Sequence, residues 1–391
     1  MALVGVSIVS LFELPPEILE LKKKVREFAE KEIRPLVPEI EKKNKIPDEL
    51  IEKIYNPPNA FQATSFPKEY GGKGMGVLGF TAIAEEIAYF NGACGILVEI
   101  GELSGSSILF GTENQKKEFL PKLTQEGKIF AFAMTEPHCG SDAAAITTTA
   151  EADGDEYVIN GRKWYISFAD EAQYFVITAK TSPEKGARGI SLFVAEKGPG
   201  VRLGKELIPM GLRGHRPFEV IFENCRVPKE NLIGEEGRGL GYAVRTLHRC
   251  RISLAAGYLG LARAALDKAI EYAKERKAFG RSLYEFQAIS FPIAEALADL
   301  EAARLLVYKA AWMYDKGENV AKESAMAKEL ASRVLLKAVD IAVTTLGGYG
   351  TIEDFDVERY YRDAKTWVFA QGTPEILKLT VSRSIFEPRR R

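Results

Sequence analysis

The sequence contains few of the residues from which metal centres and disulfide frameworks are built. Its 391 residues include only three histidines and four cysteines, which are Cys94, Cys139, Cys225 and Cys250. The cysteines form no CxxC pair, so the spacing excludes a recognisable metal-ligand set. We therefore expect reduced thiols, no metal site and a cytoplasmic protein.

Long apolar runs and an excess of charge of either sign are also lacking. No apolar stretch reaches the roughly 18 residues needed to span a bilayer. The apolar segment 2–12 lacks a basic leader and a small-residue cleavage site, so it does not predict a signal peptide. Lys and Arg together number 53 and Asp and Glu together 54, which gives no overall field that would collect nucleic acid or an anionic membrane.

The spacing of apolar residues in segment 1–128 predicts a helical domain. Apolar residues within 18–33 recur at intervals of three and four, and this pattern stops at Pro35. The glycine-rich segment 71–76 predicts a loop. Further helical stretches are predicted over residues 47–55, 79–110 and 113–126.

The pattern changes twice further along the chain. Short apolar runs separated by turn residues predict an antiparallel β domain over residues 129–236, with Asn160 and Gly161 in a type I′ hairpin turn. Residues 237–391 return to long helices and predict a helical bundle. One face of such a helix is expected to hold Leu300, Ala303, Val307, Ala310 and Tyr314.

Two glycine-rich segments raise the question of a nucleotide site. Neither residues 71–76 nor residues 347–350 follow a predicted strand and open a helix, as the dinucleotide-binding fingerprint requires. A Rossmann fold is therefore not expected. Each loop taken alone predicts only a turn.

Six motifs that follow one another along nearly the whole chain indicate a family. They are MTEPHCGSD (134–142), NGRKWYIS (160–167), ERKAFGRSLYEFQA (275–288), LGGYG (346–350), ERYYRDAK (358–365) and QGTPEI (371–376). In this order the chain resembles the acyl-CoA dehydrogenase family of flavoproteins. The resemblance implies a mostly α fold with an N-terminal helical domain, an antiparallel β domain and a C-terminal four-helix bundle.

The same resemblance implies the ligands and partners. The cofactor would be FAD, the substrate an acyl-CoA thioester of fatty acid metabolism, and the electron acceptor electron-transfer flavoprotein or another carrier. The chain would assemble as a homotetramer, with a heteromer as the alternative.

By resemblance, the residues that hold FAD fall into groups. Those that would meet the flavin of their own chain, or lie beside it, are Met134, Thr135, Ser141, Tyr165 and Ser167. Those that would reach the cofactor of a neighbouring subunit are Arg276, Phe279, Gln287, Gly347 and Gly348. Those that match positions touching the adenosine part are Thr373 and Glu375.

The substrate side of the resemblance rests on three residues. Ser141 and Arg251 match positions that contact CoA in relatives, and His248 stands where the family often has Asp. Arg251 lies on an otherwise apolar helix, where an unpaired charge is costly to bury. We therefore expect Arg251 to have a carboxylate partner or an anionic ligand, and His248 to be a polar spacer or a further candidate base.

The residue that would take the substrate proton is where the sequence departs from the family. The family removes a proton from the carbon next to the thioester carbonyl while a hydride leaves the next carbon. Its members place the required Glu either at the position of Gln371 or at the position of Cys250. The amide of Gln371 cannot accept that proton, although its backbone N–H could hold the thioester carbonyl.

Besides His248, Cys250 and the pair Glu99 and Glu102 stay open as replacements for the missing base. Cys250 could act as a thiolate, helped by Arg249 and Arg251, or could be an inert buried thiol. Glu99 and Glu102 lie three residues apart on one helix face, where their proximity could raise one pKa. The other interpretation of this pair is a salt-bridge partner or a partly solvated face.

Three functions are compatible with these residues. The first is an FAD-dependent oxidoreductase that dehydrogenates acyl-CoA thioesters at the α,β bond with a relocated or unusual base. The second is a related enzyme of different chemistry, such as a desulfinase or another elimination that needs no α-proton base. The third is a non-catalytic FAD-binding subunit of a hetero-oligomer.

Overall fold

The structure is a computed structural model that describes residues 14–387. The apolar segment 2–12 therefore lies outside the described residues. No helix within residues 14–387 is long and apolar enough to cross a membrane.

The N-terminal part is helical, as predicted. Its helices are α1 (Pro16–Phe28), α2 (Val37–Lys43), α3 (Asp48–Tyr55), α4 (Gly76–Phe90), α5 (Gly92–Ile108) and α6 (Glu113–Thr124). Pro35 does not stop the first helical segment, because a π turn (Ala29–Ile33) and a 3-10 turn (Arg34–Leu36) continue into α2.

The stretch predicted over residues 79–110 is helical, but it is divided into two helices at Asn91. The Asn91 backbone is extended (φ −154°, ψ 124°), and its side chain accepts a hydrogen bond from the N–H of Cys94. An asparagine in this conformation caps the free N–H groups at a helix start. The break separates α4 from α5 and so gives α5 its own direction.

Seven strands form one sheet in the middle of the sequence. They are β1 (Phe130–Ala133), β2 (Thr149–Asp153), β3 (Glu156–Ser167), β4 (Tyr174–Lys180), β5 (Ile190–Glu196), β6 (Val201–Glu206) and β7 (Pro217–Pro228). The order is β1-β4-β2-β3-β7-β6, with β5 paired to β4. An antiparallel sheet was predicted, but the sheet is mixed, because β1 and β2 pair parallel with β4. Parallel neighbours need a long connection, and the β2–β3 hairpin lies within the connection from β1 to β4.

The hairpin predicted at Asn160 and Gly161 is also wrong. Both residues lie inside β3, where the pairing with β7 shifts register between Ile159 and Gly161. The turn comes earlier, at Gly154, whose φ of 59° suits glycine. At the bulge the Asn160 side chain accepts a hydrogen bond of 2.8 Å from the N–H of Asn224, so this polar residue serves the strand pairing rather than a turn.

The C-terminal part is a helical bundle, as predicted. Its elements are α7 (Gly239–Glu275), β8 (Lys277–Ala278), β9 (Arg281–Ser282), α8 (Gln287–Asp315), α9 (Ala321–Leu346), α10 (Val357–Trp367) and α11 (Pro374–Phe386). The predicted inner face of α8 is buried at Leu300, Ala303, Val307 and Ala310, and Tyr314 is half-buried. Helix α9 ends at Leu346, and Gly347 is its C-cap residue.

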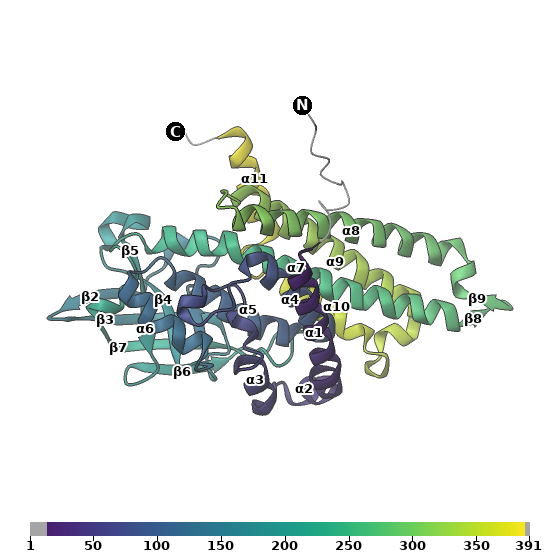
Figure 1. Cartoon of the computed structure of the whole chain (residues 1–391), viewed down its shortest axis with the longest axis horizontal. Helices are drawn as coiled ribbons and strands as arrows, with labels where there is room; N and C mark the ends of the chain where they lie inside the picture. The colour runs from purple at the N-terminus through teal and green to yellow at the C-terminus, as the bar shows by residue number, and fades with distance from the viewer. Residues whose placement is uncertain (1–13, 388–391) are drawn as a thin grey trace.

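The long helices connect two distant ends of the molecule. Figure 1 shows the sheet at one end of an elongated shape and the β8–β9 hairpin at the other, with α7 and α8 running toward the hairpin. Helix α7 packs on α4 and α5 as well as on α8 and α9. Residues of α7 therefore meet both the N-terminal helices and the bundle.

The packing of α7 on α4 depends on a glycine. A Cβ atom at Gly260 would lie 2.1 Å from the carbonyl oxygen of Glu85 and 3.0 Å from the nitrogen of Tyr89. These are backbone atoms, which cannot rotate away. The two helices can be this close only because Gly260 has no side chain.

We predict that Gly260→Ala lowers the free energy of unfolding by about 2 kcal/mol, because the added methyl group forces α4 and α7 apart. Gly241→Ala is a matched control on the same helix, since no atom lies within 4 Å of its Cβ position. The control should be neutral or slightly stabilising, because alanine favours helix more than glycine does. Equal urea unfolding curves for the two variants would contradict the close approach.

Candidate active site

Gln371 lies in a tight turn between α10 and α11. Its φ is 55° and that of Gly372 is 108°, so both residues adopt the left-handed region. The hydroxyl of Thr373 accepts a hydrogen bond of 3.4 Å from the N–H of Ile376 and caps α11. The turn therefore begins where α10 ends at Trp367 and ends at the Thr373 cap of α11.

Two cationic side chains hold this turn through its carbonyl groups. Arg251 Nε donates to the carbonyl oxygen of Gln371 at 2.9 Å. Lys328 Nζ donates to the carbonyl oxygens of Gly372 at 2.8 Å and Val368 at 3.2 Å. The carboxylate partner that was one of the two expectations for Arg251 is not found among the described residues, since its observed partner is this carbonyl. Burial lowers the pKa of Arg251 to about 10.

The Gln371 side chain points to a buried carboxyl group on α5. Gln371 Nε2 donates to Glu99 Oε1 at 3.2 Å, and the Ser253 hydroxyl of α7 donates to the same oxygen at 3.1 Å. Glu99 is 4% exposed. Burial and the neighbouring Glu102 raise the pKa of Glu99 well above its ordinary value. Glu99 therefore keeps its proton to higher pH than a solvated glutamate.

Polar atoms of these two side chains are left without partners. Within the described residues, the buried atoms Glu99 Oε2 and Gln371 Oε1 make no hydrogen bond. A buried polar atom without a partner costs about 1–3 kcal/mol. Such atoms are rare in folded proteins and call for an explanation. A hydrogen-bonding ligand at this point would satisfy them.

Glu102 is on the same face of α5, as predicted, but it is engaged elsewhere. Its carboxylate forms an ion pair of 2.7 Å with Arg249 and accepts a hydrogen bond from the Ser65 hydroxyl. Arg249 also donates to Ser65 at 2.6 Å. Both members of the ion pair are buried. Glu102 thus has the salt-bridge role that was the alternative to catalysis.

Cys250 has the environment of an unreactive thiol. Its side chain is fully buried. Burial, together with the carboxyl groups of Glu99 and Glu102, raises the pKa of the Cys250 thiol well above its ordinary value, although Arg249 opposes this. A thiol must lose its proton to act as a base or nucleophile, so this environment disfavours the catalytic interpretation.

A large cleft lies along the first part of α7. Its volume is about 1870 Å³, and it is lined by α7, the turn from α8 to α9, part of α11 and the segment before α7. His248 is among its lining residues, whereas Gln371 and Glu99 are not. Ser106, another lining residue, donates to Glu102 at 3.5 Å. The lining holds the cations Arg188, Arg238, Arg245 and Arg383 and as many carboxylates, which are Glu235, Glu236, Glu318 and Glu387, so it has no excess of either charge.

The residues predicted to meet a flavin of their own chain lie at the edge of the sheet. Met134 and Thr135 follow β1, and Tyr165 and Ser167 end β3. The N–H of Trp164 donates to the carbonyl oxygen of Thr135 at 2.8 Å, which joins the two segments. The Tyr165 ring is 64% exposed and its backbone φ is 59°. An exposed aromatic ring beside free hydroxyl groups fits a planar polar cofactor such as FAD, and Ser141 is exposed as well.

The second predicted FAD group lies far from the first within one chain. Its members flank the β8–β9 hairpin, at the opposite end of the molecule from the sheet (Figure 1). They are exposed, and Phe279 is 97% exposed. The Arg276 guanidinium lies 5.8 Å from the centre of the Tyr349 ring, beside Gly347 and Gly348. A single chain therefore does not bring the two groups together.

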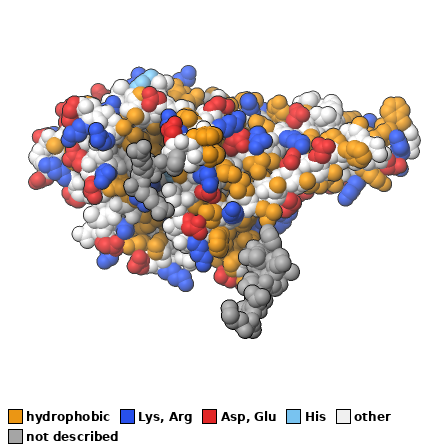
Figure 2. All heavy atoms as spheres, turned by 90° about the horizontal axis from the view of Figure 1, so that it is seen from above, with side chains coloured by type: hydrophobic (Ala, Val, Ile, Leu, Met, Phe, Trp, Pro, Cys, Tyr) orange, Lys and Arg blue, Asp and Glu red, His pale blue; other side chains and the backbone are white. Residues whose placement is uncertain are grey.

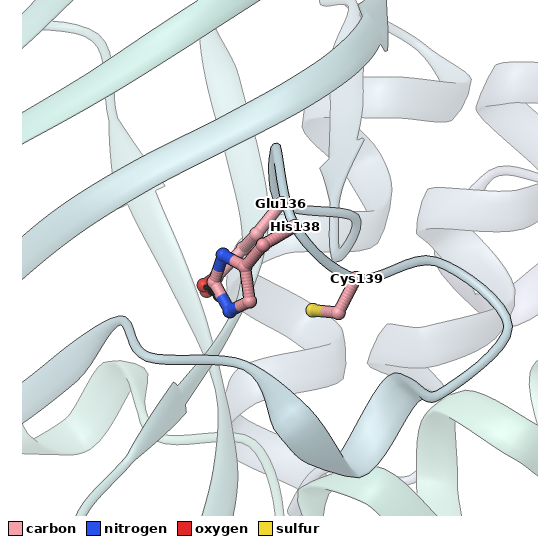
Figure 3. Close-up of side chains that lie close together, drawn as sticks. All are labelled: Glu136, His138 and Cys139. Carbon is pink, nitrogen blue, oxygen red and sulfur yellow. Dashed lines mark ion pairs between the residues drawn. The ribbon is translucent and has the colours of Figure 1, made fainter.

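Three potential metal ligands meet in the loop after β1, although no such set was expected from the sequence. Glu136, His138 and Cys139 place one ligand atom each within 4.8 Å of one another (Figure 3). The Glu136 carboxylate accepts hydrogen bonds from Thr147 and Thr148. It also forms an ion pair of 2.9 Å with Lys163. Despite its burial, these partners lower the pKa of Glu136 to about 2. The carboxylate is thus occupied in holding the loop together.

Sequence reasoning missed two residues of the site, Ser253 and Lys328. Ser253 lies among small and apolar residues of α7 and carries no distinctive signal. Lys328 did offer a signal, because it shares the buried face of α9 with Ser324, Ala331 and Leu335. A lysine at core spacing on a helix is unusual enough to mark a specific contact.

Comparisons with known proteins identify the family. Family models described as the acyl-CoA dehydrogenase N-terminal, middle and C-terminal domains match residues 15–127, 131–225 and 237–386. The chain is 40% identical over 370 residues to the 3-(aryl)acrylate reductase of Clostridium sporogenes (strain ATCC 15579), covering 94% of this chain and 98% of that protein. It is 40% identical over 366 residues to the caffeyl-CoA reductase-Etf complex subunit CarC of Acetobacterium woodii, covering 93% and 96%.

A solved structure is similar over nearly the whole chain. The butyryl-CoA dehydrogenase of Megasphaera elsdenii superposes with a TM-score of 0.93 at 36% identity, covering 96% of this chain and 99% of that one. The chain belongs to the acyl-CoA dehydrogenase family of flavoproteins. It is an FAD-dependent oxidoreductase of acyl-CoA thioesters.

We predict that Glu102 stabilises the fold through Arg249. Arg249→Met leaves a buried carboxylate without its cation and should lower the free energy of unfolding by about 3 kcal/mol or more. The double variant Arg249→Met, Glu102→Gln should recover part of this loss, because no charge is left unpaired. Urea unfolding measures both variants, and a double variant no more stable than the single one would contradict the ion-pair role.

Proposed function

We propose that Glu99, rather than the residue at position 371, exchanges the α-proton of the acyl-CoA substrate. The observation that carries this proposal is the 3.2 Å hydrogen bond from Gln371 Nε2 to Glu99 Oε1. It puts a carboxyl group next to the position where the family resemblance places the base. Gln371 and Ser253 both donate to Oε1, which leaves Oε2 as the oxygen that can exchange a proton.

The proposed chemistry divides the work between the chain and its cofactor. In α,β-dehydrogenation the α-carbon loses a proton to Glu99 and the β-carbon loses a hydride. FAD, when bound, supplies the acceptor for that hydride. Gln371 orients Glu99, and Arg251 and Lys328 hold the turn that carries Gln371.

A second candidate is the reverse direction, the reduction of an α,β-unsaturated acyl thioester. The observation that favours it is the raised pKa of Glu99, since reduction needs a protonated acid to deliver a proton to the α-carbon. Two similar proteins, the 3-(aryl)acrylate reductase and the caffeyl-CoA reductase subunit, carry names of this reaction. Both directions use the same proton site.

The proposal extends to assembly as a homotetramer. Figure 2 looks onto the α8 and α11 side of the molecule, where hydrophobic side chains gather along the arm formed by the bundle. Exposed residues on these helices include Phe291, Leu305, Trp312, Leu379 and Ile385. An apolar surface of this kind is typical of an interface. Assembly would also bring the two FAD groups of different chains together.

Partner, setting and domain limits complete the proposal. The name of the caffeyl-CoA reductase-Etf subunit supports an electron-transfer flavoprotein as electron acceptor.

Four free cysteines support a reducing, cytoplasmic setting, and acyl-CoA substrates support a role in fatty acid metabolism. The proposed domains are residues 1–128, 129–236 and 237–391.

We predict that Glu99→Gln lowers the rate of flavin bleaching by a saturated acyl-CoA by about 100-fold or more, because the variant lacks the proton acceptor. The measurement is stopped-flow absorbance of the holoprotein under anaerobic conditions, with a panel of acyl-CoA thioesters. Cys250→Ala is the control and should bleach as the wild type does. If Cys250→Ala lost the activity while Glu99→Gln kept it, the assignment to Glu99 would be wrong.

A swap variant tests the position of the base separately. Glu99→Gln combined with Gln371→Glu moves the carboxyl group to the position that most of the family uses. Recovery of bleaching in this double variant would support a site that needs one carboxyl group at this point. If the wild type bound CoA esters but neither bleached nor reoxidised with any thioester, an elimination chemistry or a non-catalytic subunit would be favoured instead.

We predict opposite pH dependences for the two directions. Dehydrogenation needs the deprotonated form of Glu99, so its rate should rise with pH through the raised pKa of this group. Reduction of an enoyl-CoA needs the protonated form, so its rate should fall as pH rises through the same pKa. Anaerobic rates of flavin reduction and reoxidation across pH measure both, and profiles of the same sign would contradict a shared proton site at Glu99.

A further inference from the structure

Lys328 is a buried lysine that takes no part in the proposed proton transfer. Its side chain is 0% exposed on the inner face of α9. No carboxylate lies within ion-pair distance of it among residues 14–387. The charged and titratable groups that face it are Arg251 and the ring of Tyr258, whose centre is 5.6 Å from Lys328 Nζ.

The contacts of Lys328 enclose Gln371 from both sides. Nζ donates to the carbonyl of Val368, three residues before Gln371, at 3.2 Å and to the carbonyl of Gly372, directly after it, at 2.8 Å. When Lys328 is protonated, its hydrogen bonds are about twice as strong as those of a neutral donor. Together with the bond from Arg251 to the Gln371 carbonyl, they account for three carbonyl groups of this turn.

The location is costly for a lysine. Burial and the nearby Arg251 lower the pKa of Lys328 to about 7, which reflects the free energy needed to keep an ammonium away from water. An apolar residue at this core position would avoid that cost. The turn that Lys328 holds is itself strained, because Gln371 is a non-glycine residue at a φ of 55°. Without its donors the turn would relax toward ordinary backbone angles.

We propose that Lys328 is a positioning residue of the active site, which holds residues 368–372 so that the Gln371 side chain reaches Glu99. This inference rests on the proposed function, since it assigns importance to the contact between Gln371 and Glu99. Lys328 touches neither that carboxyl group nor the cleft. It acts on the reaction only through the backbone of the turn.

The test uses the holoprotein and three variants. Lys328→Met removes the charged donor at similar length, Lys328→Arg keeps a cationic donor, and Lys337→Met is the control. Lys337 is on the same helix but forms a half-exposed ion pair of 2.8 Å with Asp299. Flavin absorbance confirms that each variant retains its cofactor, and Lys328→Gln replaces Lys328→Met if the latter does not fold.

Two readouts separate positioning from general stability. Hydrogen exchange of the amides in residues 368–373 should be faster in Lys328→Met and unchanged in Lys337→Met. With a substrate that bleaches the wild type, kcat should fall by about 100-fold in Lys328→Met, as misplacement of a reacting group predicts, while KM changes by less than about threefold. Lys328→Arg should recover part of kcat.

The outcomes also distinguish failure of this inference from failure of the proposed function. Unchanged exchange in residues 368–373 of Lys328→Met, or an equal loss of kcat in Lys337→Met, would overturn the positioning role. If no acyl thioester changes the flavin spectrum of the wild type, the proposed function fails. The exchange comparison still decides whether Lys328 holds the turn.

Discussion

The buried carboxyl group of Glu99, which has no ion-pair partner among residues 14–387, constrains this active site more than any other group. Glu99 and Glu102 are one turn apart on α5 and both are buried, yet their surroundings differ. Glu102 forms an ion pair of 2.7 Å with Arg249. Within the part of the chain that the structure describes, Glu99 has only the neutral donors Ser253 and Gln371, so low dielectric surroundings favour its protonated form.

The helices around Glu99 are arranged so that this neutral acid meets one specific turn. Helix α7 contributes Ser253 to Glu99 and Arg251 to the turn, and α9 contributes Lys328. The close packing of α7 on α4 at Gly260 sets the distance of α7 from the N-terminal helices. The site thus combines both helical parts of the chain. Glu99 comes from the N-terminal helices, and the other residues come from the C-terminal bundle.

Much of the fold follows from the sequence, and the exceptions have physical causes. Helical periodicity predicted the core face of α8, because burial there is decided along one helix. Asn160 and Gly161 predicted a turn, but Gly154 took the turn and the pair became a bulge in β3. The break at Asn91 was missed because both helices beside it are buried on nearly all sides, so no change of periodicity marks it. The parallel pairing of β1 with β4 depends on contacts across some forty residues, which local patterns do not encode.

The site was predictable as a set of residues but not as an arrangement. Gln371 and Glu99 were each marked by their chemistry, yet they are 272 positions apart, and only the folded chain brings them into contact. Arg251 was expected to need an anion, whereas a carbonyl of the turn satisfies part of its bonding. Motif order identified the family, while the identity of the proton-exchanging group depended on three-dimensional neighbours.

The most direct measurement of the central claim follows the substrate α-hydrogen rather than the electrons. Holoprotein is incubated in deuterium oxide with a saturated acyl-CoA under anaerobic conditions, and mass spectrometry counts deuterium at the α-carbon of the recovered thioester. With Glu99 as the proton-exchanging group, the wild type incorporates deuterium and Glu99→Gln does not. The control Glu102→Gln, measured on folded protein, incorporates deuterium as the wild type does. Incorporation by Glu99→Gln at the wild-type rate would contradict the account.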